Sequence, residues 1–170
     1  MFNETLAILV ATVLSGIMSG IYFTGDGSMQ WGVLYGPGIF FGVATAGLFI
    51  WLRKTPFLKA ALWAGASISS WFAAIQIYIR LPENNGGPIG LVVAGVCGAA
   101  LLGSFYSMLV REISWQRFVV VVIAGGIMAA IMSTVLQQQD SASALRYIVS
   151  FVIWQVGVGL ALAAELNSRK

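Results

Sequence analysis

The sequence contains very little charge. Of its 170 residues only fifteen are charged, nine of them Lys or Arg and six Asp or Glu, while 59% are hydrophobic. A soluble domain averages about 25% charged residues, because its surface must face water. Fifteen charges cannot cover such a surface, so the composition excludes a soluble enzyme, a disordered protein and a nucleic-acid-binding domain. The class that remains is an integral membrane protein, whose first partner is the lipid bilayer.

The side chains that perform most catalysis are also scarce. The chain has no histidine, and Cys97 is its one cysteine, so neither an internal disulfide nor a His/Cys metal site can form. A serine nucleophile would find no base. The middle of each apolar run is free of Asp, Glu, Lys and Arg, which disfavours proton coupling and voltage sensing. We therefore expect a protein that is not an enzyme, with no catalytic residues, no metal and no cofactor.

What the sequence does contain is six charge-free apolar runs. Each is long enough for the roughly 20 residues that a helix needs to cross about 30 Å of hydrocarbon. The runs predict an all-α, polytopic membrane protein with a single membrane domain over 1–170. The six transmembrane helices are expected near 4–23, 35–53, 60–79, 89–110, 117–137 and 147–166.

The few charges are distributed unevenly between the connections. The segments 53–59 and 111–117 and the C-terminal tail hold seven of the nine cations, and the connections on the other side hold Arg80 and Arg146. Positive residues concentrate on the cytoplasmic side of membrane proteins. The distribution predicts that both termini are cytoplasmic, in a membrane of the bacterial inner (plasma) membrane type.

The odd-numbered runs share a pattern of residue sizes. The segments 15–21, 69–75 and 125–131 each read small-small-large-large-small-small-Ile. One interpretation is an internal repeat of three helical hairpins, each about 55 residues long and related by an axis along the membrane normal, as in parallel transporter repeats. The other interpretation is coincidence, because membrane helices are generally rich in Gly, Ala and Ser.

Pairs of small residues spaced four apart occur in each of the six apolar runs. In a bilayer, such pairs let two helix backbones approach closely. They predict a tight six-helix bundle, or faces that contact other membrane subunits. The pairs are Gly16/Gly20, Gly38/Gly42, Ala61/Gly65, Ala94/Gly98, Ala99/Gly103, Gly126/Ala130 and Gly157/Ala161.

The side chains expected deep in the membrane are neutral polar or aromatic. A buried indole or amide needs a hydrogen-bonding partner in hydrocarbon. The partner could be a small neutral or aromatic solute, or it could be another helix. The candidate ligand-binding residues are Trp71, Gln76, Tyr106, Trp154 and Gln155.

The segment 24–32 is the most distinctive connection, with a glycine on each side of Asp26. With Trp31 and Tyr35 it could form a lid over the outer end of the bundle. The simpler alternative is a turn that ends in interfacial aromatic anchors. A single acidic residue is too few to hold a cation, which needs several oxygen ligands.

Two functions are compatible with these patterns. In size and number of spans the chain is similar to the membrane-embedded substrate-binding subunits of energy-coupling-factor vitamin transporters, a similarity of size and hydropathy only. It implies a transport function in which a solute binds beneath the first connection and small-residue faces contact a partner. The alternative is an accessory or structural subunit of a larger membrane complex, in contact with protein, lipid or pigment.

Overall fold

The computed structural model describes residues 4–23, 30–52, 54–81, 87–137 and 143–167. Regular structure in these ranges is helical throughout. The helices are α1 (Glu4–Phe23), α2 (Gln30–Trp51), α3 (Phe57–Arg80), α4 (Pro88–Leu109), α5 (Trp115–Gln137) and α6 (Ser143–Asn167). In the described part of the chain, five helices are long and apolar enough to span a membrane, and α2 contributes a shorter apolar stretch, Tyr35–Trp51. The predicted all-α membrane fold is confirmed.

The bounds of α2 differ most from the prediction, which began this helix at residue 35. The structure begins α2 at Gln30 and includes Pro37 within it. Proline is tolerated within membrane helices. One residue after Pro37, the carbonyl of Gly38 accepts a hydrogen bond from Ser67 Oγ of α3 at 2.9 Å, which joins α2 to α3. Each of the other five helices starts and ends within four residues of its predicted bounds.

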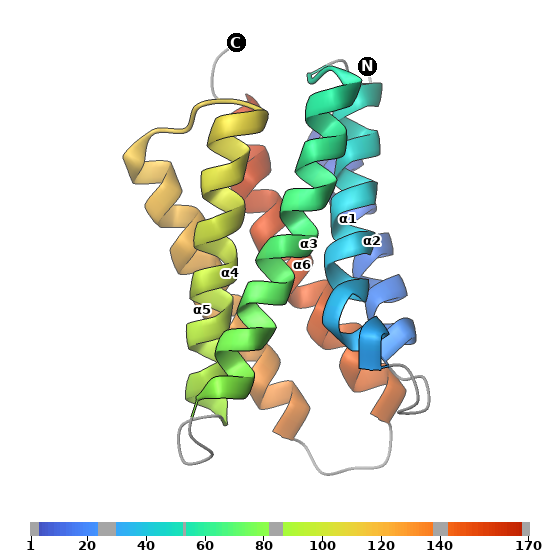
Figure 1. The fold of residues 1–170 in the computed structure, drawn as a ribbon, viewed down its shortest axis with the longest axis vertical. Helices are drawn as coiled ribbons and strands as arrows, with labels where there is room; N and C mark the ends of the chain where they lie inside the picture. Colours follow the sequence, from blue (N-terminus) through green and yellow to red (C-terminus); the bar gives the residue numbers. More distant parts are fainter. Residues whose placement is uncertain (1–3, 24–29, 53, 82–86, 138–142, 168–170) are drawn as a thin grey trace.

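The contacts between the six described helices close a ring, and Figure 1 shows these helices as one bundle. Each packs against its neighbours in sequence, and α6 returns to pack against α1. Helices α1, α3 and α5 begin at one end of the bundle, and α2, α4 and α6 end there. We call this the terminal end. Arg117 joins the last two helices near it, donating from Nη1 to the carbonyl of Ala164 at 2.8 Å.

The closest interface in the ring lies between α1 and α6. A Cβ atom added at Gly16 would lie 2.6 Å from the Cα of Val152. Gly20 faces the backbone of Ile148 in the same way, and Gly159 of α6 faces Thr12. Main chain therefore lies against main chain along this interface, as small residues in a bilayer permit.

The α2–α3 and α4–α5 interfaces are built similarly. A Cβ at Gly38 would lie 2.8 Å from the Cα of Ile68, and Gly95 of α4 faces Gly125 of α5. The pair Ala61/Gly65 is an exception to the packing prediction. Both residues are exposed on α3, and a Cβ at Gly65 would meet nothing within 4 Å.

The ring order does not decide whether the chain contains a repeat. Three consecutive hairpins would produce this order of helices, and so would six unrelated helices packed in sequence. The predicted triplication therefore stays a prediction.

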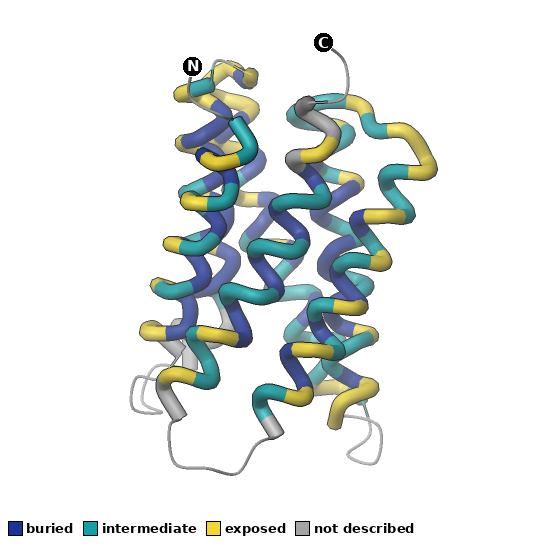
Figure 2. The backbone as a smooth tube through the Cα atoms, turned by 180° about the vertical axis from the view of Figure 1, so that it is seen from behind, coloured by how far each residue is buried: buried dark blue, intermediate teal, exposed yellow. Residues whose placement is uncertain are grey.

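Burial follows the pattern expected of a membrane bundle. Figure 2 shows buried residues along the inward faces of the helices and exposed residues along the outward faces. The outward residues are largely apolar: Leu14, Val43, Leu62 and Ile123 are all more than half exposed. Since lipid is as apolar as leucine, such a surface is stable only in a bilayer.

Candidate solute pocket

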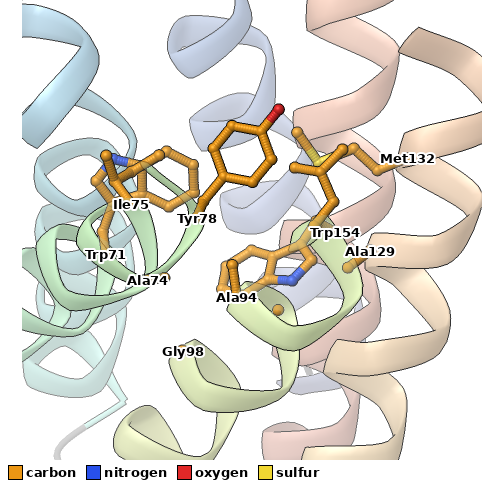
Figure 3. Close-up of a pocket in the computed structure, with 11 residues that line it drawn as sticks. Trp71, Ala74, Ile75, Tyr78, Ala94, Gly98, Ala129, Met132 and Trp154 are labelled. Atoms are coloured by element: carbon orange, nitrogen blue, oxygen red, sulfur yellow. The ribbon is translucent and has the colours of Figure 1, made fainter. Parts of the chain in front are cut away.

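An apolar cavity of about 50 Å³ lies between α3, α4, α5 and α6. It is in the half of the bundle away from the terminal end. Two tryptophans and a tyrosine contribute its largest side chains, as Figure 3 shows. The lining residues are Trp71, Ala74, Ile75, Tyr78, Leu91, Ala94, Gly95, Gly98, Ala129, Met132 and Trp154.

Trp154 lies near the centre of the ring. Its side chain is 8% exposed and makes edge contacts with Phe41 of α2 and Trp71 of α3, with ring centroids 6.5 and 6.4 Å apart. Trp71 in turn lies 5.5 Å from the ring of Phe151. These contacts hold the two indoles in place, so the aromatic wall of the cavity is formed before any ligand arrives.

The indole N–H of Trp154 is the polar group of most interest here. It makes no hydrogen bond to any residue that the structure describes, although an indole N–H in an apolar interior usually has a partner. It lies beside Gly95, since a Cβ placed there would be 3.5 Å from Trp154 Nε1. The walls of the cavity itself are apolar throughout, so this N–H does not face into it.

Space in the cavity is limited by two movable side chains. In Figure 3 the ring of Tyr78 lies between Trp71 and Met132, over the indole of Trp154. A dry cavity that binds benzene measures about 150 Å³, so a ligand of that size requires a rearrangement here. Tyr78 is only half-buried and methionine adapts readily, so these two side chains can provide the room.

Of the five candidate ligand-binding residues, the structure brings Trp71 and Trp154 together at this cavity. Gln155 lies on another face of α6, where its amide Nε2 donates to Ser19 Oγ at 2.8 Å. Its amide oxygen accepts a hydrogen bond from Ser15 Oγ. Gln155 thus joins α6 to α1, which is the helix-to-helix partnership that the sequence left as the alternative.

Tyr106 and Gln76 also lie away from the cavity. Tyr106 is fully buried nearer the terminal end, in an aromatic cluster with Phe49 and Trp63. In that cluster Trp63 Nε1 donates to Thr45 Oγ1 at 2.8 Å. Gln76 lines a shallow surface depression beside Arg80. Neither residue therefore shares the cavity with Trp71 and Trp154. The ligand-binding role of these two residues stays a prediction.

Two of the three residues predicted to form a lid lie in a helix. Asp26 lies outside the described residues. Trp31 and Tyr35 fall within α2, because this helix begins at Gln30, and the side chain of Trp31 is outside the described part. The ring of Tyr35 stacks on Phe72 of α3 at 5.4 Å. Tyr35 therefore packs between two helices at the end of the bundle where α2 begins.

Sequence reasoning missed Tyr78 and Met132 as pocket residues. Tyr78 is two positions before Arg80, near the end of the span predicted over 60–79. Helical spacing could have found it, because residues 71, 74, 75 and 78 share one face of a helix. No comparable signal marks Met132, because its role depends on how α5 packs against α4 and α6.

Comparison with known proteins identifies no relative. No protein-family model, no curated protein and no solved structure matches the chain. The class of protein is nevertheless defined by its fold, an all-helical integral membrane bundle.

Proposed function

We propose that the chain is a membrane-embedded solute-binding protein that takes up a compact, largely aromatic molecule between α3, α4, α5 and α6. The observation that carries the proposal is an apolar cavity whose wall includes the two packed indoles of Trp71 and Trp154. A compact ligand with an apolar aromatic ring matches this arrangement, because its ring can contact the two indoles.

The proposed orientation places the terminal end in the cytoplasm. Lys54, Lys59, Arg111 and Arg117 lie at or near the terminal end, and this bias is the one seen in cytoplasmic connections. The cavity then lies in the outer half of the bundle, which suits capture of a solute from outside. On this proposal, the protein acts as the solute-binding subunit of a transport system.

Reducing the cavity by one methyl group is expected to weaken ligand binding at least tenfold. A Cβ at Gly98 would lie 3.3 Å from Ala74 Cβ and 3.8 Å from Trp154 Cζ2, so Gly98→Ala narrows the cavity with only a small shift of side chains. Binding can be measured by ¹⁹F NMR, titrating 4-fluorobenzaldehyde into the detergent-solubilised protein. Empty micelles correct for partitioning of the probe.

Gly65→Ala is the matched control, since a Cβ there meets nothing within 4 Å and lies outside the cavity. A second variant, Trp154→Phe, makes the aromatic wall of the cavity smaller. It should weaken 4-fluorobenzaldehyde and fluorobenzene alike, because this wall contacts the ring of either probe. Equal binding of the probe by Gly98→Ala and Gly65→Ala would contradict the proposed site.

The accessory-subunit function is favoured by a different observation. The small pair Ala61/Gly65 is exposed on α3 and makes no close helix contact within the ring. A partner helix could approach closely there. Co-purification of a fixed membrane partner that Gly65→Leu abolishes, together with no saturable binding of either probe, would favour this function over solute binding.

A further inference from the structure

A second apolar depression runs along the outside of the bundle between α1 and α2. This groove measures about 430 Å³ and is much larger than the cavity at Trp154. Ala7 and Leu48 are buried in its floor, and Leu6, Leu14 and Trp51 are roughly half exposed at its edges. A Cβ at Gly47, in the middle of the groove, would meet nothing within 4 Å.

The groove extends over only part of the bundle. Its α2 side runs from Ala44 to Trp51, which at 1.5 Å per residue is about 10 Å. Towards the other end of these helices the space is closed. There Tyr22 packs edge-on against Phe40 at 5.6 Å, and a Cβ at Gly36 would lie 2.6 Å from Tyr22.

The open end of the groove carries one charge of each sign. Just beyond Leu6 and Trp51, Lys54 Nζ lies 3.2 Å from Glu4 Oε1. The Lys54 side chain is 33% exposed and that of Glu4 is 23% exposed, so the Lys54 charge can be reached from the membrane surface. The second carboxylate oxygen of Glu4 is buried and has no hydrogen-bond partner among the described residues. Rotation about the soft terminal torsion of Glu4 can turn this oxygen outward.

We infer that the groove binds a phospholipid whose headgroup carries a primary ammonium, of the phosphatidylethanolamine class. One acyl chain lies along Gly47, the phosphate contacts Lys54, and the ammonium contacts Glu4. The polarity of the groove matches this molecule, because it is apolar along its length and has both charges at one end.

The length of the groove favours a lipid over a helix. A leaflet provides about 15 Å of hydrocarbon, half of the bilayer core, and an acyl chain from one leaflet need not pass the closed end at Tyr22. A transmembrane helix, from a second copy or from another protein, would continue across the whole bilayer and meet that obstruction. Glu4 also disfavours a purely anionic headgroup, because it would repel a second negative charge.

Filling the groove tests the inference directly. The purified protein is exchanged into mixed micelles containing equal amounts of phosphatidylethanolamine, phosphatidylglycerol and phosphatidylcholine, and retained lipid is counted by native mass spectrometry. We expect one phosphatidylethanolamine per chain, retained at least fivefold over the other two. Gly47→Leu should reduce its retention at least tenfold, whereas Gly65→Leu, an equally unobstructed glycine on α3, should retain it.

Headgroup selection is tested separately with Glu4→Gln, which removes the negative charge and keeps the shape. Its retention of phosphatidylglycerol should rise to equal that of phosphatidylethanolamine. Equal retention of the three lipids by the unmodified protein would overturn the inference. So would equal loss in Gly47→Leu and Gly65→Leu, or a dimer that Gly47→Leu alone dissociates, since a second copy would then occupy the groove.

Discussion

Gly16→Leu is expected to destabilise the bundle by about 3 kcal/mol or more. A Cβ at Gly16 would lie 2.6 Å from Val152 Cα and 2.8 Å from Val152 N, so the clash is with main chain that cannot rotate away. Overpacking a well-packed interior costs about 1–3 kcal/mol even where side chains can adjust. Here α1 and α6 must separate, and the polar contacts between them are lost as well.

The measurement is the unfolding midpoint in a mild detergent titrated with sodium dodecyl sulfate. Gly65→Leu makes the same chemical change within a helix but into open space, so it serves as the control. It is expected to be neutral or slightly stabilising, because leucine has a higher helix propensity than glycine by about 1 kcal/mol. If Gly16→Leu unfolded at the same midpoint as this control, α1 and α6 would not meet at Gly16.

The second large effect concerns the buried amide of Gln155. Replacing Ser15 and Ser19 together by alanine is expected to cost about 3 kcal/mol, because the amide then stays buried with neither of its partners. Replacing Gln155 by leucine in the unmodified protein should cost only about 1 kcal/mol. The difference arises because each serine has a second acceptor in its own helix.

Those alternative acceptors are close. Ser15 Oγ lies 3.0 Å from the carbonyl of Thr12, and Ser19 Oγ donates to the carbonyl of Ser15 at 2.7 Å. Both hydroxyls therefore remain bonded when Gln155 is absent. In the double-alanine background, Gln155→Leu should consequently stabilise the protein, reversing the sign of its effect.

A double-mutant cycle of unfolding free energies tests this reversal. The four proteins are the unmodified chain, Ser15→Ala/Ser19→Ala, Gln155→Leu and the triple variant. A triple variant less stable than the double-alanine protein would show that Gln155 contributes through packing or through other partners. In that case the hydrogen bonds to α1 would not govern its energetics.

The helices were predictable because hydrophobic length and the position of charges determine where a membrane helix can lie. The structure confirms the six helices from those two signals. The start of α2 was predicted less well. The sequence of 36–38, Gly-Pro-Gly, indicates a helix start in water, whereas in the structure α2 continues through Pro37 and packs closely against α3 at Gly38.

The candidate site was predictable only in part. Trp71 and Trp154 were identified because a tryptophan in mid-membrane is unusual, and they do meet at the cavity. Gln155 carries the same signal as a ligand-binding amide, yet it bonds to α1. Burial of a polar group tells that it needs a partner, and the helix face on which it lies decides which partner it finds.

The sequence by itself therefore determined the class of protein and the helices. A chain with fifteen charges in 170 residues, placed at the ends of apolar runs, is stable only in a bilayer. The tertiary structure alone decided which small residues touch backbone and which stay exposed, as Gly16 and Gly65 illustrate. The physical reason is that every helix here is apolar all round, so hydrophobicity does not indicate its inward face. That face is selected by close packing and hydrogen bonds between residues far apart in the chain.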